Sequence, residues 1–480
     1  MKIRTRFAPS PTGSLHIGSL RTALYSYVFA KSQSGKFILR IEDTDLKRLV
    51  PKATEGIYQM LKKFGIAWDE GPLVGGPHQP YIQSGRVKSG LYRQYAEKLV
   101  SDGRAYYCCC PPESLSEIEK RHQKGKVDLR DPCRKLGVEA VKAKTQKGKS
   151  LAVRLKIPDN ETVSYHDFVL KKEVSWETEN VDEVMLLKSD GYPTYHLGVV
   201  VDDALMKVSH IIRGRDWLPS TPVHLLLYRY LGFSLPQIGH LTDILDPAGG
   251  KLSKRKGSVT CEEFLEQGYL PEAILNFIML LGWAPKNDRE FFSLEEFVKE
   301  FQKGELHVAN PVFNRKKLDW FNGMYIRKKS ENELLQLIKP FIPRGMDGSL
   351  AKKVLPLVKD RLRKLSEFSE LTDFFIKKPK VDPKLIVQKD KTKSVTKAAL
   401  STISNQLSAI NGVDWRFENL EKIIRKYHAE KLADWSTGQL FMTLRIAVTG
   451  RKATPPLFET MEVLGKEKTL KRLQKASQVL

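Results

Sequence analysis

Near the start of the chain stands Phe7-Ala8-Pro9-Ser10-Pro11-Thr12-Gly13-Ser14-Leu15-His16-Ile17-Gly18-Ser19-Leu20-Arg21, the stretch around which the rest of the sequence is organised. The alternating run before it, Ile3 to Phe7, predicts a strand, and apolar residues at helical spacing after it predict a buried helix. A Pro- and Gly-rich loop joins the two. A helix N-terminus after such a loop offers unpaired N–H groups to an anion, and His16 is placed to donate a further hydrogen bond. The stretch predicts a phosphate site, although similar loops occur in α/β proteins that have none.

Composition limits the class of protein. At 480 residues and 41% hydrophobic content, the chain should form two to four domains with real cores. The net charge of +24, from 80 Lys and Arg against 56 Asp and Glu, favours nucleic acid as a partner, unless the excess is only a solvated surface. No apolar run approaches the roughly 18 residues that span a bilayer, and no apolar signal region follows the first six residues. A cytoplasmic chain with no membrane partner is therefore expected, and its five Cys do not make a disulfide scaffold.

Polar clusters follow two of the predicted strands. The strand Lys36 to Ile41 continues into Glu42-Asp43-Thr44-Asp45, and the strand His210 to Arg213 continues into Gly214-Arg215-Asp216-Trp217. Ligands of open α/β sheets bind at the carboxyl ends of strands. Asp45 could instead cap the next helix. Glu42 directly continues its strand, and a carboxylate there suits an ammonium group.

Between these two strands the sequence predicts a small α+β insertion, from about Tyr106 to Glu183. Its Cys108 and Cys110, with Cys133 downstream, could reach one tetrahedral metal ion. A fourth ligand is not obvious, because Lys135 stands where one is expected. A structural zinc is therefore possible, but reduced thiols are favoured.

The second informative stretch is Gly249-Gly250-Lys251-Leu252-Ser253-Lys254-Arg255-Lys256-Gly257. Its glycines let the loop move, and its four cations suit a triphosphate. A basic loop alone is more often a solvated turn or a nucleic-acid patch, but its pairing with His16-Ile17-Gly18 rarely arises by chance. From Glu262 onward the periodicity is almost entirely helical, and Lys377 to Lys397 predicts a connector between two helical halves.

These motifs together point to a family. The chain resembles class I aminoacyl-tRNA synthetases, specifically glutamyl-tRNA synthetases of the bacterial type, in Ala8-Pro9-Ser10-Pro11-Thr12-Gly13 with His16-Ile17-Gly18-Ser19, in Arg40-Ile41-Glu42-Asp43-Thr44-Asp45 and in Lys251-Leu252-Ser253-Lys254-Arg255. The first motif of the class usually ends in His; here it ends in Ser19, as is usual in the glutamyl branch.

The resemblance implies a Rossmann-type α/β catalytic domain with an inserted α+β domain, followed by an all-α C-terminal anticodon-binding region. It implies two halves of the catalytic domain at 1–105 and 184–245, separated by an acceptor-binding insertion at 106–183. The basic loop and a stem-contact region would occupy 246–323, and the anticodon-binding region 324–480.

The implied reaction has two steps. ATP with Mg²⁺ and glutamate form glutamyl-adenylate and pyrophosphate, and the 3′-terminal adenosine of tRNA-Glu then takes the glutamyl group. The enzyme is expected to be a monomer that holds no catalytic metal through its own side chains. An anionic glutamate side chain needs a cation, and arginine offers a bidentate fork for a carboxylate.

The resemblance also assigns residues by position. Those that would contact glutamate are Arg6, Ser10, Glu42, Tyr195 and Arg213. Those that would contact ATP are Pro9, Ser10, Gly13, His16, Gly18, Ser19, Ser253 and Lys254. The catalytic set would be His16, Gly18, Lys251, Lys254 and Arg255. Asp45 and Arg361 would contact tRNA, although Arg361 could equally be an exposed helical arginine without that role.

Three rival classes are less consistent with the sequence. A glutaminyl-tRNA synthetase would carry a β-barrel in its C-terminal part and a small residue in place of Arg213. A synthetase-like enzyme that modifies a tRNA base would lack the C-terminal half. A non-catalytic nucleic-acid-binding protein has no need of His16, Gly18 and the basic loop. Whether the chain also charges tRNA-Gln stays open.

Overall fold

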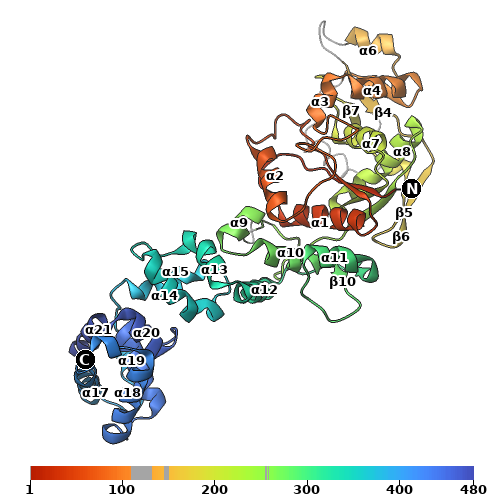
Figure 1. Ribbon diagram of the computed structural model, residues 1–480. Helices are drawn as coiled ribbons and strands as arrows, with labels where there is room; N and C mark the ends of the chain where they lie inside the picture. Colours follow the sequence, from red (N-terminus) through yellow and green to blue (C-terminus); the bar gives the residue numbers. More distant parts are fainter. Residues whose placement is uncertain (1, 110–131, 145–150, 254–256, 258) are drawn as a thin grey trace. The chain divides into compact units, whose positions relative to one another are not determined.

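The computed structural model describes all residues except 1, 110–131, 145–150, 254–256 and 258 (Figure 1). The chain forms two compact units, a first unit of Met1–Leu265 and Ile274–Asn314 and a second unit of Glu266–Ala273 and Arg315–Leu480. In the part of the chain that is described, no helix combines the length and apolar character needed to cross a membrane. The finer domain boundaries implied by the resemblance stay predictions.

The first unit alternates strands with helices. Its strands are β1 (Arg4–Phe7), β2 (Lys36–Leu39), β3 (Ala105–Cys108), β4 (Ala152–Leu155), β5 (Thr162–Asp167), β6 (Lys172–Glu177), β7 (Met185–Leu187), β8 (His210–Gly214), β9 (Gln237–Leu241), β10 (Trp283–Ala284) and β11 (Glu305–Leu306). Its helices are α1 (Ile17–Lys31), α2 (Ala53–Lys63), α3 (Gln83–Lys88), α4 (Leu91–Ser101), α6 (Val138–Lys144), α7 (Tyr195–Leu205), α8 (Thr221–Leu231) and α11 (Leu294–Glu300). Residues of both units occur in α9 (Cys261–Glu266) and α10 (Pro271–Met279).

Four parallel strands bring their carboxyl ends to one edge. β1 pairs in parallel with β2, and the buried helix α1 is the crossover that connects them. β8 pairs in parallel with β9. β1 also lies beside β8, because the Ser209 N–H donates to the Arg4 carbonyl (2.9 Å). This arrangement confirms the Rossmann-type fold, and such an edge is where ligands bind.

The hairpin of β5 and β6 extends this same sheet. β5 is antiparallel to β6 and parallel to β9, in the register Asp167↔Ile238. Apolar residues from Val163 to Leu170 predict a strand that overlaps β5, but β6 has little such signal, because only Val174 and Trp176 are partly buried in it. The pairing with β9 joins segments some 70 residues apart, which local periodicity does not report. β3, β4 and β7 form a separate antiparallel sheet.

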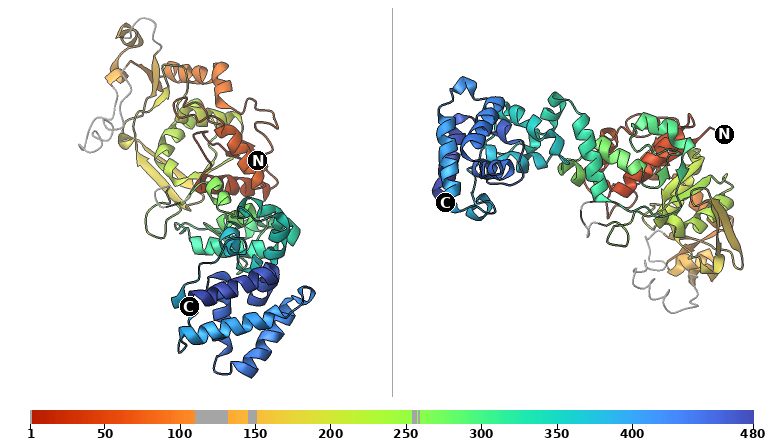
Figure 2. Two further views of the ribbon diagram at one scale, coloured as in Figure 1. Left: turned by 90° about the vertical axis from the view of Figure 1, so that its left-hand side faces the viewer. Right: turned by 90° about the horizontal axis from the view of Figure 1, so that it is seen from below.

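The second unit, in which every residue is described, consists of helices and loops (Figure 2). Its helices are α12 (Arg315–Lys328), α13 (Glu331–Leu337), α14 (Gly348–Val358), α15 (Glu367–Thr372), α16 (Pro383–Ile386), α17 (Lys393–Ser408), α18 (Phe417–Lys431), α19 (Thr437–Thr449), α20 (Leu457–Leu464) and α21 (Lys466–Val479). They share one apolar core that includes Leu355, Phe375, Leu400 and Leu444. The all-α prediction is confirmed, and the expected connector from Lys377 to Lys397 contains α16 and the start of α17.

Candidate active site

The loop before α1 is held in place by its own histidine. His16 is the N-cap of α1, and its Nδ1 accepts a hydrogen bond from the Gly18 N–H (3.0 Å). Because Nδ1 accepts, the neutral ring carries its proton on Nε2, the nitrogen from which it can donate. A Cβ on Gly18 would lie 3.4 Å from His16 Nδ1, so a side chain there would crowd the ring. The two residues thus form one small, rigid turn at the helix start.

The chain returns to this turn immediately after the basic loop. The Ile17 N–H donates to the Val259 carbonyl (2.9 Å), and the Cys261 N–H donates to the Leu15 carbonyl (2.8 Å). The two motifs that the sequence analysis paired are therefore joined through the backbone, although some 240 residues separate them.

The basic loop carries one described cation of the predicted catalytic set. Lys251 forms ion pairs with Asp216 and with Asp243, at 3.0 Å from an oxygen of the latter. Burial lowers the pKa of Lys251, but the two carboxylates outweigh it and raise the pKa above its ordinary value. Lys254 and Arg255 lie outside the described residues. A polyphosphate that binds Lys251 competes with these carboxylates for its ammonium group.

A cleft of about 660 Å³ at the carboxyl edge of the sheet brings most of the predicted residues together. The predicted residues that line it are Arg6, Pro9, Ser10, Gly13, His16, Gly18, Ser19, Glu42, Tyr195, Arg213 and Lys251. Ser253 is described but does not line the cleft. The residues predicted to bind glutamate and most of those predicted to bind ATP thus line one continuous cleft.

Asp45 and Arg361 lie elsewhere. Asp45 does not line the cleft and forms an ion pair with Arg48. The N-cap of α2 is Lys52, so the alternative role of Asp45 as a helix cap is wrong. Arg361 belongs to the second unit, where it is exposed in the turn Lys359–Arg361.

Glu42 presents a buried carboxylate to the cleft. Its N–H donates to the Pro9 carbonyl (3.0 Å), which ties the end of β2 to the opening loop. Arg40 donates to its Oε1 (2.8 Å), and the contacts of Glu42 among the described side chains all use that oxygen. Burial raises the pKa of Glu42 above that of an ordinary glutamate, while Arg40 acts in the opposite direction. Arg40 therefore favours the ionised form of the Glu42 carboxyl group.

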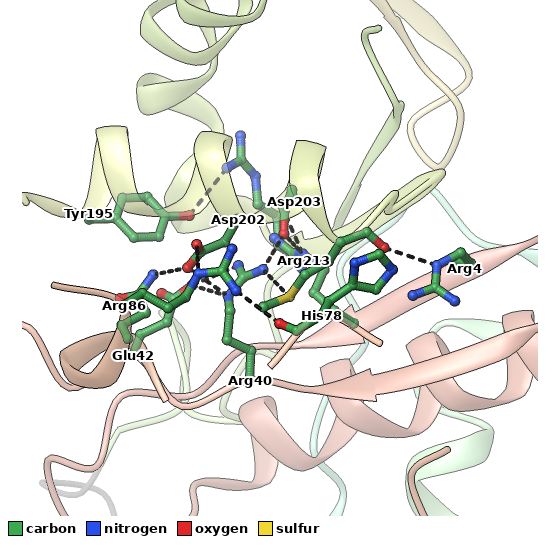
Figure 3. Close-up of polar contacts among 12 residues, drawn as sticks. Arg4, Arg40, Glu42, His78, Arg86, Tyr195, Asp202, Asp203 and Arg213 are labelled. Atoms are coloured by element: carbon green, nitrogen blue, oxygen red, sulfur yellow. Dashed lines mark hydrogen bonds and ion pairs between the residues drawn. The ribbon is translucent and has the colours of Figure 1, made fainter. Parts of the chain in front are cut away.

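A network of buried ion pairs lies behind Glu42 (Figure 3). Arg40 also binds Asp203 (2.6 Å), which in turn binds Arg6 (3.1 Å). The neighbouring Asp202 pairs with Arg86 (2.8 Å) and lies 3.7 Å from Arg40. The sequence motifs gave no role in the site to Arg40, Asp202 or Asp203. Their one signal was an Asp-Asp doublet directly after Val199-Val200-Val201, in a helix whose other residues here are buried and apolar.

Arg213 differs from these arginines because its partners are uncharged. It is 4% exposed, and it donates to the Tyr195 hydroxyl (3.3 Å), His224, His240 and Thr221. Among the described residues, no carboxylate lies within ion-pair distance of it. Burying a cation without a counter-ion costs several kcal/mol. The cleft therefore contains a cationic position suited to an incoming anion, and Tyr195 and Arg213 face each other there (Figure 3).

The cysteines form a separate cluster. Cys108 and Cys133 are buried, and the sulfurs of Cys109 and Cys133 lie 3.8 Å apart. Cys110 lies outside the described residues. No group of three or more metal-ligating side chains occurs within the described ranges. The choice between zinc and reduced thiols stays a prediction.

Known proteins resemble this chain over its whole length. Residues 2–320 match the family tRNA synthetases class I (E and Q), catalytic domain, and residues 333–477 match the anticodon binding domain family. A glutamate–tRNA ligase of Dehalococcoides mccartyi is 41% identical over 99% of this chain and 97% of its own, and that of Treponema denticola is 39% identical over 99% of both chains.

Solved structures agree with these relatives. The glutamate–tRNA ligase from Elizabethkingia meningosepticum, in complex with its amino acid, superposes with a TM-score of 0.85 at 34% identity and covers 100% of both chains. A second structure, of glutamate–tRNA synthetase from Elizabethkingia anophelis, has a TM-score of 0.86 at 33% identity. The catalytic match covers more than half of the chain and the relatives cover nearly all of it, so the chain belongs to the class I tRNA synthetase family of the E and Q type.

Proposed function

We propose that this chain is a glutamate–tRNA ligase. It activates glutamate with ATP, releases pyrophosphate, and transfers the glutamyl group to the 3′-terminal adenosine of tRNA-Glu. The single observation that carries the substrate choice is the buried Arg213, which has only uncharged partners. A glutamate side chain supplies the missing negative charge, whereas glutamine does not.

The cleft has one part for the amino acid and one for ATP. Glu42 binds the α-ammonium group of glutamate, and Arg213 with Tyr195 binds its side-chain carboxylate. Arg6, in β1, and Ser10, in the opening loop, line the same cleft and add contacts to the amino acid. An ammonium group beside Glu42 would offset the burial that raises the pKa of this carboxyl.

ATP, together with its Mg²⁺, occupies the part of the cleft near α1. His16 donates from Nε2 to a phosphate, the start of α1 supplies further N–H groups, and Gly18 keeps the approach open. Lys251, Lys254 and Arg255 neutralise charge on the phosphates while the α-phosphorus is attacked. The helical second unit, with Arg361 on its surface, binds tRNA. Action as a cytoplasmic monomer stays a prediction.

Pyrophosphate exchange tests the proposal. Exchange of labelled pyrophosphate into ATP is expected with glutamate and tRNA-Glu present, and glutamine should not replace glutamate. Arg213→Cys should raise the KM for glutamate at least about 30-fold, because truncating one partner of a buried, hydrogen-bonded charge pair costs about 2 kcal/mol or more. The KM for ATP should be unchanged. Exchange driven by glutamine alone would overturn the assignment, and an equal loss for ATP would give Arg213 a phosphate role.

A further inference from the structure

The guanidinium group of Arg213 is held by uncharged groups from several elements. Its Nε–H donates to His240 Nε2 (2.9 Å), and its Nη2 donates to Thr221 Oγ1 (2.9 Å). Its Nη1 donates to His224 Nδ1 (3.0 Å) and to the Tyr195 hydroxyl (3.3 Å). These contacts use four of the five guanidinium N–H groups. The plane of the guanidinium is therefore set by the protein.

His240 can accept this hydrogen bond in only one neutral tautomer. Its Nε2 has to be unprotonated, so its proton is on Nδ1, 2.7 Å from Asp167 Oδ2. The other tautomer, or the charged ring, would turn an N–H toward the Arg213 Nε–H. Burial lowers the pKa of His240, with Asp167 opposing, so the ring stays neutral near pH 7.

Asp167 is itself fixed by the turn that follows β5. Its Oδ1 accepts the N–H groups of Val169 (3.1 Å) and Leu170 (2.9 Å), and its Oδ2 accepts the Tyr165 hydroxyl (2.7 Å). Burial raises the pKa of Asp167, but hydrogen bonds from His240 and Leu170 outweigh it, and the pKa lies below its ordinary value. An ionised carboxylate at this point accepts only, and it therefore selects the His240 tautomer that Arg213 requires.

We infer that Asp167 and His240 are positioning residues that aim Arg213 at the side-chain carboxylate of the substrate and so set the preference for glutamate over glutamine. The inference rests on the role proposed above for Arg213. The fixed guanidinium presents its one remaining N–H group and its positive charge to the substrate side chain, and a carboxylate compensates that charge whereas a neutral carboxamide does not. The pairing of β5 with β9 brings Asp167 to His240. The hairpin assigned to the insertion thus reaches the amino-acid site.

Asp167→Asn is the decisive variant. Asparagine has the shape of aspartate and keeps one oxygen to accept the N–H groups of the turn, but its NH₂ group faces His240 Nδ1. The proton of His240 then has to sit on Nε2, where it points at the Nε–H of Arg213 and removes the hydrogen bond between them. The KM for glutamate should rise by about tenfold or more. The preference for glutamate over glutamine should fall by a similar factor. Because ATP binds elsewhere in the cleft, kcat at saturating glutamate and the KM for ATP should stay within about threefold of wild type.

Two further variants separate positioning from stability. Tyr165→Phe removes a hydroxyl that contacts both the same Asp167 oxygen (2.7 Å) and His240 Nδ1 (3.0 Å). The Asp167 carboxylate still accepts the hydrogen bond from His240 Nδ1 in this variant, so the KM for glutamate should change far less than in Asp167→Asn. His240→Gln places an amide oxygen where Nε2 accepts, and in the Asp167→Asn background it should restore part of the lost glutamate preference. Thermal unfolding of each variant reports whether it folds. If Asp167→Asn does not fold, His240→Leu replaces it, since it removes the acceptor and leaves Asp167 in place.

The outcomes are distinct. Wild-type KM for glutamate and wild-type selectivity in Asp167→Asn, or in its replacement, would overturn the inference. So would losses spread equally over glutamate, ATP and kcat, which indicate a structural role. If the wild-type protein does not use glutamate, the proposed function fails first, and that result is seen without any variant.

Discussion

Replacing Arg40 by methionine tests whether the buried ion pairs behind the cleft act as one balanced network. The network has three arginines and three carboxylates and therefore no net formal charge; its members are Arg6, Arg40, Arg86, Glu42, Asp202 and Asp203. Methionine has a similar reach and no charge, so the substitution leaves one buried negative charge unbalanced. Removing one partner of a buried ion pair costs about 3–5 kcal/mol. At about 2 °C per kcal/mol for a unit of this size, Tm should fall by about 6–10 °C.

Thermal and urea unfolding measure this loss. Lys98→Met is the matched control, because it breaks an exposed pair with Asp102 in the same unit and should leave the Tm almost unchanged. The double variant Arg40→Met with Glu42→Gln restores the charge balance and should be more stable than Arg40→Met alone. A Tm for Arg40→Met within about 2 °C of wild type would refute the reasoning, and so would a double variant that loses stability additively.

Two other predictions concern the phosphates and the pH. Lys254→Ala should lower kcat by at least about 100-fold in aminoacylation, as expected for the loss of one charge-stabilising group, while circular dichroism stays that of the wild type. Burial lowers the pKa of His196 to about 4, and burial with Arg213 holds the pKa of His224 well below its ordinary value. Both rings are neutral in the folded protein but take up a proton below about pH 6.5 in the unfolded chain. Their contribution to the free energy of unfolding is therefore fully present above that pH, and below it falls by about 1.4 kcal/mol per pH unit for each ring. The urea midpoint should therefore drop between pH 7 and pH 5.5, and a constant midpoint would contradict the assignment.

Local sequence signals predicted the elements better than their pairing. The strand, loop and helix from Ile3 onward, and the helices of the second unit, follow from periodicity and from turn residues. The addition of β5 and β6 to the main sheet does not, because strand pairing is set by contacts between segments far apart in the sequence. β6 also lies at an edge with one partly buried face, so its apolar alternation is weak.

The candidate site likewise contains residues that the sequence predicted and residues that it did not. Motifs and resemblance named Glu42 and Arg213, and both line the cleft. Neither source gave Arg40 or Asp203 a role in the site, because an ion pair between residues some 160 positions apart leaves no local pattern. The charged doublet of α7 was the one visible sign that a helix otherwise apolar at that point needed a buried cation.

The contrast between Arg6 and Arg213 explains why charge balance identifies substrate positions better than burial does. Both side chains are buried to the same degree and line the same cleft. Arg6 has Asp203 as a counter-ion, so its charge is already satisfied and it can only add hydrogen bonds to a ligand. Arg213 has a shell of neutral acceptors that fixes its direction but leaves its charge uncompensated. A substrate anion therefore gains the most binding free energy at Arg213, and the preference for glutamate over glutamine depends on the groups that keep this shell neutral.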